Sequence, residues 1–361
     1  MISALKYVII KIVTPENFVL GGILLKILLI GGTGTISMAI TRLLAVRGDE
    51  LWLLNRGSRS VELPDSVKVI EADINNEQEV AEKLDGLSFD CVGEFIGFVP
   101  EQLERDFRLF YGKTCQFIYI SSASAYQKPP KNYIITEDTP LENPYWEYSR
   151  NKKACEELLM EKYRQTGFPV TIVRPSHTYD ERSVPLGVHG RNGSWQVVKR
   201  IMEGKQVLIH GDGTSLWTIT HNSDFARAYV GLIGRQEAIG QAYHITSDES
   251  VTWNHIYHAI ADALGVELKP YYVASQTLAD MSDFDLTGSL IGDKANSVIF
   301  DNSKIRSVVP DFKARISAED GIKMTVENIL DHPEFQTEDK EFDEWCDKVI
   351  ETLEQAKSVM K

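Results

Sequence analysis

Short apolar segments alternate with longer amphipathic segments over the first half of the chain, from Lys26 to Pro175. Apolar segments bounded by polar turns predict buried strands, and the amphipathic segments between them predict helices. We expect strands at residues 27–30, 50–54, 67–70, 89–92, 116–120 and 170–173. This alternation predicts an α/β fold, a Rossmann-like doubly wound parallel sheet with helices on both faces.

The pattern is looser after the sixth strand, where a loop region rich in Gly, His and Arg follows. Further strands are expected at 207–209 and 242–245, and helices near 195–203, 224–232, 253–264, 318–330 and 341–357. We expect the C-terminal segments to form a smaller α/β lobe beside the sheet, where a substrate would bind.

Composition and charge exclude several classes of protein. The 361 residues carry a formal net charge of −14, which argues against a nucleic acid as the main partner. The four cysteines are scattered and no metal-ligand spacing is present, so we expect free thiols, no metal and a cytoplasmic location. Residues 1–24 are apolar, but charged residues and Pro15 interrupt them and no cleavage site follows. We interpret residues 1–24 as an N-terminal appendage and expect no membrane contact.

The strongest local motif lies where the first strand ends. Ile27–Ile30 leads directly into Gly31-Gly32-Thr33-Gly34-Thr35-Ile36-Ser37, and a helix is expected immediately afterwards. Such a turn lets backbone N–H groups approach a pyrophosphate at the positive end of the helix. Ser37 replaces the usual third glycine and is its smallest polar substitute. The motif therefore predicts a dinucleotide-binding site.

The end of the second strand indicates which dinucleotide is preferred. An NAD enzyme usually has an acid here that accepts from the ribose 2′-hydroxyl, whereas an arginine can pair with the 2′-phosphate of NADP. This strand ends in Asn55 and Arg56, with no acid. NADP is therefore slightly favoured over NAD, and the alternative is that Arg56 is a solvated loop charge.

Three residues suggest the chemistry. Tyr148 and Lys152 are four residues apart, on one face of the helix expected over 146–166, and Ser122 follows the fifth strand at its carboxyl end. Lys152 and a nicotinamide ring would lower the pKa of Tyr148 from about 10. Tyr148 could then take the proton of a substrate hydroxyl, or return it in reduction, while Ser122 holds the substrate oxygen. The set predicts nicotinamide-dependent chemistry on a carbinol or ketone.

Together these motifs resemble the extended short-chain dehydrogenase/reductase superfamily, specifically the NAD-dependent epimerase/dehydratase family, over residues 26–245. The Asn-Arg-Gly end of the second strand resembles a branch that includes chloroplast stem-loop-binding proteins. The resemblance implies that Ser122, Tyr148 and Lys152 form a catalytic triad, and that the protein forms a homodimer packed through the Tyr/Lys helix. In addition to Asn55 and Arg56, it implies cofactor contacts by Gly31, Thr33, Gly34, Thr35, Ile36, Asp73, Ile74, Phe95, Ile96, Gly97, Pro175 and His177.

Two departures from the family pattern bear on the substrate. Nucleotide-sugar dehydratases carry an Asp-Glu pair after the catalytic Ser or Thr, whereas this chain has Ala123 and Ser124, so dehydration by that route is not expected. Trp217 stands where an arginine tends to clamp the diphosphate of the substrate; its indole could stack on a sugar or be a core aromatic instead. Substrate contacts are expected from Ser124, His177, His189, Arg191 and Trp217, and His177 could be a second acid or base.

We therefore predict an NAD(P)-dependent oxidoreductase or epimerase that acts on a secondary alcohol or ketone of a sugar or sugar derivative. One alternative is a redox-neutral epimerase of a nucleotide sugar. Another is a non-catalytic nucleotide-sensing or RNA-binding protein on the same scaffold. The NAD(P)-binding domain is expected at residues 25–185, with a contribution from 220–248, and the substrate lobe at 186–219 and 249–361.

Overall fold

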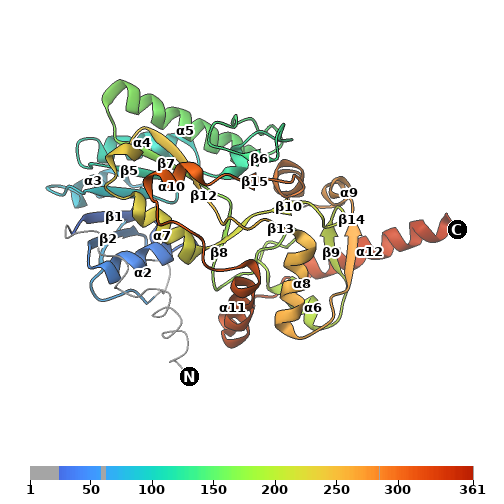
Figure 1. Ribbon diagram of the computed structural model, residues 1–361. Coiled ribbons are helices and arrows are strands. Elements are labelled where there is room, and N and C mark those ends of the chain that lie inside the picture. The colour runs from blue at the N-terminus through green and yellow to red at the C-terminus, as the bar shows by residue number, and fades with distance from the viewer. Residues whose placement is uncertain (1–23, 58–61, 284, 361) are drawn as a thin grey trace.

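A seven-stranded parallel sheet forms one side of the molecule in the computed structural model, which describes residues 24–57, 62–283 and 285–360 (Figure 1). Across the sheet the strands are β12 (Gln241–Ile245), β7 (Val170–Pro175), β5 (Phe117–Ile120), β4 (Cys91–Glu94), β1 (Lys26–Ile30), β2 (Glu50–Asn55) and β3 (Lys68–Glu71). The strand order reverses between β1 and β4, which is where open α/β sheets bind their ligands. The Rossmann-like fold is confirmed, and the predicted appendage lies outside the described residues except for Leu24.

Alternate residues of the central strand explain why helices cover both faces. Ile27 and Leu29 of β1 join a core with one group of helices, and Leu28 and Ile30 join a second core on the other face. The first group is α2 (Ser37–Arg47), α7 (Asn222–Leu232) and α10 (Ser303–Val308). The second is α3 (Glu77–Lys83), α4 (Pro100–Phe110) and α5 (Glu147–Thr166). A strand buried on both faces is apolar along its buried length, as β1 is from Ile27 to Ile30.

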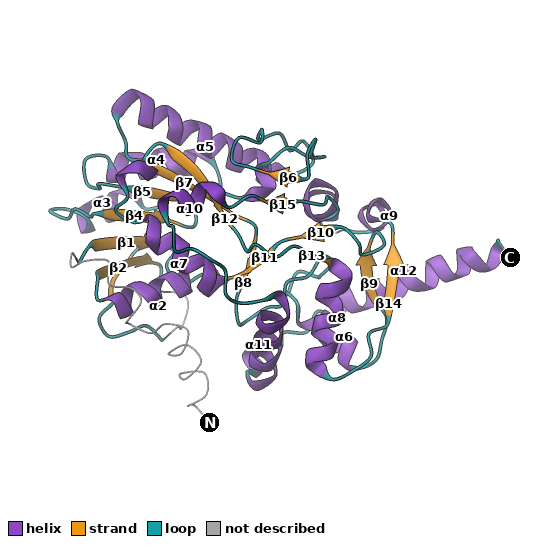
Figure 2. Cartoon of the chain, viewed as in Figure 1, coloured by secondary structure: helices purple, strands orange, loops and turns teal. Residues whose placement is uncertain are grey.

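A smaller lobe lies beside the carboxyl ends of the strands, and its helices surround a third core (Figure 2). Trp253 and Ile260 of its central helix are fully buried in this core. The helices are α6 (Trp195–Met202), α8 (Trp253–Leu264), α9 (Ser275–Asp280), α11 (Ala318–Asp331) and α12 (Lys340–Val359). Its strands pair two by two: β9 (Val207–His210) with β14 (Pro270–Val273), and β10 (Leu216–Trp217) with β13 (Val251–Thr252).

Short elements connect the two parts and were not predicted from the sequence. Two parallel pairs join distant segments: β8 (His177–Tyr179) with β11 (Ile219–His221), and β6 (Ile134–Ile135) with β15 (Ile299–Phe300). The remaining short elements are η2 (Ala123–Ala125), η3 (Gln236–Ala238), η4 (Thr287–Lys294) and η5 (Pro333–Phe335). Strands of two or three residues are too short to leave a periodic pattern in the sequence.

The fourth strand differs from its predicted bounds of 89–92 and forms at Cys91–Glu94 instead. Gly93 and Glu94 pair with Leu29 and Ile30 of β1, so backbone pairing extends the strand past its apolar residues. No helix within the described residues is long and apolar enough to span a bilayer.

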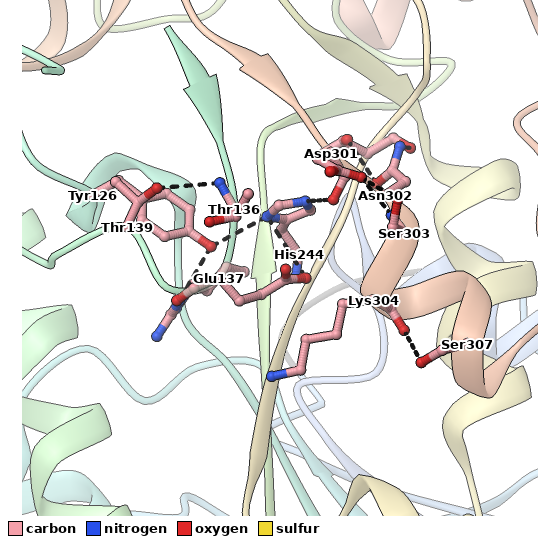
Figure 3. A network of polar contacts seen from close by, with 12 residues as sticks. Tyr126, Thr136, Glu137, Thr139, His244, Asp301, Asn302, Ser303, Lys304 and Ser307 are labelled. Atoms are coloured by element: carbon pink, nitrogen blue, oxygen red, sulfur yellow. Dashed lines mark hydrogen bonds and ion pairs between the residues drawn. The ribbon is translucent and has the colours of Figure 1, made fainter. Parts of the chain in front are cut away.

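A buried polar network fixes the outer strand β12 against β6 and β15 (Figure 3). His244 of β12 donates from Nε2 to the carbonyl of Asp301 (2.7 Å) and accepts at Nδ1 from the Tyr126 hydroxyl (3.2 Å). The backbone N–H of His244 donates to the Glu137 carboxylate (3.0 Å). Burial lowers the pKa of His244, which agrees with the neutral ring that this pattern requires. The network therefore holds Tyr126 at the edge of the candidate site.

Candidate functional site

A groove of about 540 Å³ runs along the carboxyl ends of β1 and β2, at the reversal of strand order. Most of the residues expected to contact a cofactor line it: Gly31, Thr33, Gly34, Thr35, Ile36, Asn55, Arg56, Asp73, Ile74, Phe95 and Ile96. The other three, Gly97, Pro175 and His177, are not among its lining residues. The groove has the place and the length that an extended dinucleotide requires.

The glycine-rich turn is shaped by Gly31 and braced by Ser37. Gly31 has φ +80°, and a Cβ atom there would lie 2.5 Å from Cγ2 of Ile96, so only glycine fits. The Ser37 hydroxyl donates to the carbonyl of Gly31 (2.7 Å) and accepts from the N–H of Gly34 (2.8 Å). Ser37 therefore does more than replace a glycine, because it cross-links the turn from inside. This cradle fits the pyrophosphate of a nicotinamide dinucleotide.

Beneath the groove lies a buried pair of carboxyl groups, Glu94 on β4 and Asp106 on α4. Glu94 accepts from the N–H of Ile96 (2.5 Å), and Asp106 accepts from Nε of Arg105 (2.9 Å). Burial raises the pKa of Glu94 well above its usual value and raises that of Asp106 to about 6. Glu94 therefore faces Asp106, and it fixes Ile96 against the glycine turn. Sequence alone did not identify this partner for Glu94.

A second cavity, of about 360 Å³, lies between the sheet and the smaller lobe. The predicted residues Ser122, Ser124, Tyr148, Pro175, His177, His189 and Trp217 line it. Lys152 links the linings of the two cavities: its Nζ donates to the carbonyls of Gly97 and Ile120 (2.8 Å each), Ile120 lines the groove, and the ammonium lies 5.7 Å from the ring centre of Tyr148, which lines the second cavity. The structure thus brings residues from five segments of the chain to one place.

The Ser122 hydroxyl is oriented by a chain of polar side chains. The amide of Asn143 donates to Ser149 (3.3 Å), and the Ser149 hydroxyl donates to Ser124 (2.8 Å). Oγ of Ser122 lies 2.9 Å from Oγ of Ser124 and also accepts from the Ser124 N–H (3.2 Å). Because Ser124 supplies both hydrogens, the Ser122 proton is left to donate into the cavity. Ser124, expected as a substrate contact, is engaged in orienting Ser122.

Tyr148 and Lys152 lie in the first turns of α5. The ring of Tyr148 packs on Trp146, with ring centres 5.0 Å apart, and the Lys152 ammonium lies 5.7 Å from the Tyr148 ring centre. Burial raises the pKa of Tyr148, and a hydrogen bond with the Ser122 side chain opposes this rise. Burial lowers the pKa of Lys152 to about 8. The arrangement can move a proton at the Tyr148 oxygen. The neighbouring cation, Lys152, loses its own charge near pH 8.

Two predicted substrate residues are placed differently from expectation. Arg191 lines neither cavity; its side chain is 63% exposed and lies 3.8 Å from Glu341. Trp217 lines the cavity but is only 4% exposed, because it stacks on Trp253 (5.8 Å) and Lys128 lies over its ring (5.5 Å). The position of Arg191 therefore does not support a substrate contact by this residue. The burial of Trp217 favours its interpretation as a core aromatic.

Three charged residues that no sequence motif indicated also line the cavity: Lys128, Asp293 and Lys294. Lys128 and Asp293 form an ion pair of 3.3 Å. The segment that carries Asp293 and Lys294, η4, packs closely on the start of α5, since a Cβ atom on Gly288 would lie 2.1 Å from Trp146. In the sequence, only the spacing of two glycines, Gly288 and Gly292, indicated that this segment packs closely on another part of the chain.

Within residues 24–57, 62–283 and 285–360, no group of three or more His, Cys, Asp or Glu side chains is arranged to hold a metal ion. The four cysteines are free thiols, and Cys91, Cys155 and Cys346 are buried.

Comparison with known proteins identifies the family. The model of the NAD dependent epimerase/dehydratase family matches residues 27–246, and the chain belongs to this family. The 2′-dehydrokanamycin reductase of Streptomyces kanamyceticus is 22% identical over 256 residues, 71% of each protein. The chloroplast stem-loop binding protein of 41 kDa b of Arabidopsis thaliana is 26% identical over 253 residues, 66% of this chain and 63% of that one. The resemblance inferred from the motifs is confirmed.

Solved structures share the fold. The epimerase Mth375 of Methanothermobacter thermautotrophicus superposes with a TM-score of 0.70 at 17% identity, over 86% of this chain and 93% of its own. The UDP-glucuronic acid 4-epimerase of Bacillus cereus, solved with UDP-glucuronic acid and NAD, gives a TM-score of 0.67 at 19% identity, over 84% of this chain and 99% of its own. At such identities these structures establish the common architecture.

Proposed function

We propose that this protein is an NAD(P)-dependent oxidoreductase or epimerase that acts on a secondary alcohol or ketone of a sugar or sugar derivative. One observation carries the proposal: Ser122 and Tyr148 line a cavity of about 360 Å³, and Lys152, beside the Tyr148 ring, donates to the carbonyl of Ile120, which lines the dinucleotide-sized groove. The family of the chain and the reductase and epimerase names of its relatives support the same chemistry. Dehydration is not proposed, because Ala123 and Ser124 supply no acid–base pair.

The residues of the chain supply binding and proton transfer. The glycine turn would hold the pyrophosphate, and a nicotinamide bound in the groove would supply the hydride acceptor or donor. In oxidation the Tyr148 oxygen takes the proton of the substrate hydroxyl; in reduction Tyr148 returns a proton to the carbonyl oxygen. Ser122 donates to the same substrate oxygen, and the Lys152 charge stabilises the Tyr148 phenolate.

The proposal is tested by mixing purified protein with NADP or NAD and a panel of free and nucleotide-linked sugars. Net oxidation or reduction changes the nicotinamide absorbance, and NMR detects an epimer formed without net redox change. Either signal would support the proposal: the absorbance change would indicate an oxidoreductase, and the epimer would indicate a redox-neutral epimerase. If the protein converts no sugar with either cofactor and binds a stem-loop RNA in a salt-dependent manner, the non-catalytic alternative would be favoured instead.

Arg56 is expected to favour NADP. Arg56 is exposed and lines the groove at the end of β2, where Asn55 and Arg56 stand in place of the acid that would accept from the ribose 2′-hydroxyl. Arg56→Glu should weaken NADPH binding relative to NADH by roughly tenfold or more, because a charge-assisted hydrogen bond becomes a repulsion. Titration of the fluorescence of each reduced cofactor measures the ratio. The matched control is Arg164→Glu, an exposed position on α5; an unchanged ratio in Arg56→Glu would contradict the prediction.

Reduction is expected to slow at alkaline pH because Lys152 loses its charge. Its pKa is lowered to about 8 by burial, whereas burial raises that of Tyr148 above its usual value. As pH rises through about 8, the phenol keeps its proton but the cation that stabilises the departing phenolate is lost. We therefore expect kcat/KM for reduction to fall above pH 8. A profile that stays level until the usual pKa of tyrosine, about 10, would assign the decline to Tyr148 instead.

A further inference from the structure

The cavity contains a cation, Lys294, that makes no ion pair within the described residues. Lys294 ends η4 and is 9% exposed, and its side chain lines the cavity. Neither a hydrogen bond nor an ion pair reaches its ammonium from the described part of the chain. The adjacent carboxylate, Asp293, acts on Lys294 through its charge, but its ion pair, at 3.3 Å, is with Lys128. A buried charge without a partner is costly, so this position is suited to a ligand that brings the missing charge.

The main chain fixes where this ammonium lies. The carbonyl of Lys294 accepts from Nε1 of Trp253 (3.1 Å), from Nε2 of His210 (3.3 Å) and from Oγ of Ser215 (3.3 Å). His210 ends β9, Ser215 lies in the segment that follows it, and Trp253 begins α8, so two segments of the smaller lobe hold the backbone at Lys294. The charge is therefore presented from a rigid support rather than from a loose surface chain.

His177 adds a neutral donor to the same cavity. Its imidazole lines the cavity, and no side-chain hydrogen bond to it is present among the described residues. Burial and the nearby Lys294 charge lower its pKa to about 3, so the ring is neutral at physiological pH and carries one N–H. An ammonium and a neutral imidazole that line one cavity are donors that a carboxylate can accept from.

The charges that line the cavity decide between anions. Burial lowers the pKa of Lys294, and the Asp293 charge opposes this shift. With Lys294 protonated, the Lys128 and Lys294 cations and the Asp293 anion leave one positive charge in the cavity. A carboxylate brings one negative charge, whereas a phosphate monoester brings about 1.5 to 2 at neutral pH. The positions also differ along the cavity, because the Asp293 charge acts on Tyr148 and the Lys294 charge acts on His177.

We propose that Lys294 and His177 bind a carboxylate on the sugar substrate, so that the preferred substrate is a sugar acid whose reacting carbinol lies at Tyr148. This inference rests on the proposed function for the reacting end and on the Lys294 surroundings for the acid. Lys294 is a specificity-determining residue in this proposal and takes no part in proton transfer.

Calorimetric titration of the full chain with bound cofactor tests it, using glucuronate against glucose and galacturonate against galactose, with the matching hexose 6-phosphates. At least one uronate should bind roughly tenfold or more tightly than its neutral hexose and than the phosphate. Lys294→Met should bring that ratio close to one, and Lys294→Arg should keep most of it. Lys323→Met, an exposed position on α11, is the matched control and should behave as wild type.

Other outcomes separate the two proposals. Equal binding of uronate and hexose, tighter binding of the phosphate, or an unchanged ratio in Lys294→Met would overturn the carboxylate site while leaving the proposed function intact. A Lys294-dependent uronate preference without any hydride exchange would retain the carboxylate site and overturn the proposed function.

Thermal melting of the unliganded variant gives a further test. Removing an unpaired buried charge should raise the melting temperature of Lys294→Met, whereas a fall would show that the ammonium already has a partner in the unliganded protein.

Discussion

Tyr148→Phe is expected to lower turnover by roughly 100- to 10,000-fold, the range that a positioned general acid or base contributes. The substitution removes only the hydroxyl that would exchange a proton with the substrate. The remaining ring can keep its packing on Trp146 and Phe98, with ring centres 5.0 and 6.4 Å away. We therefore expect cofactor affinity to stay within a few-fold of wild type, as a test of whether the loss is chemical.

The assay uses the sugar that gives the largest signal in the panel and follows nicotinamide absorbance, or NMR of the epimer if no net redox change occurs. Tyr111→Phe is the matched control, because its hydroxyl donates to the carbonyl of Thr166 at the far end of α5 and its side chain is exposed. Full turnover by Tyr148→Phe would show that another group handles the proton. His177 would then be the first candidate, since it lines the same cavity.

The fold and the cofactor groove could be predicted because each depends on contiguous sequence. The apolar strand at 27–30 and the glycine turn after it are adjacent in the chain, and β1 ends at the reversal of strand order. The Tyr148 and Lys152 pair follows from helical spacing alone. Such local patterns predict the same strand, turn or helix face however the rest of the chain packs.

The remaining features of the site depend on tertiary packing that no local pattern encodes. Asp106 meets Glu94 only because α4 docks beneath the end of β4. Lys294 enters the cavity because η4 packs closely on Trp146 through Gly288. A lysine in a polar segment is usually a solvated charge, so its burial could not be inferred from the sequence. The sequence therefore indicates the Tyr148 and Lys152 pair, which is local, but not the charged residues that tertiary packing brings into the cavity.

Arg174→Met is expected to destabilise the protein by about 3–5 kcal/mol, the usual cost of leaving one partner of a buried ion pair unpaired. Arg174 on β7 is 6% exposed and donates to both carboxylate oxygens of Glu156, at 3.0 and 2.6 Å. Glu156 also accepts from the Ser121 hydroxyl at 2.5 Å. Without the guanidinium, a buried carboxylate would lose its only cationic partner among the described residues.

Denaturant unfolding, followed by tryptophan fluorescence, measures the change. The matched control is Arg108→Met. Arg108 also forms a bidentate ion pair, with Glu77, but both of these side chains are well exposed. An exposed pair of this kind is worth about 0–1 kcal/mol. Equal losses in the two variants would contradict a special role for burial. Adding Glu156→Leu to Arg174→Met should restore part of the stability, because the unpaired carboxylate is then removed as well.

The same pair also connects stability to the proposed chemistry. Tyr148, Lys152 and Glu156 follow one another at intervals of four residues and therefore lie along one face of α5. Arg174 and Ser121 bind Glu156 from β7 and from the end of β5, which fixes the register of this face against the sheet. We therefore expect Arg174→Met protein that remains folded to show a lower kcat as well, since a displaced α5 moves the Tyr148 oxygen away from Ser122. If kcat were unchanged, the buried pair would stabilise the fold without positioning the helix.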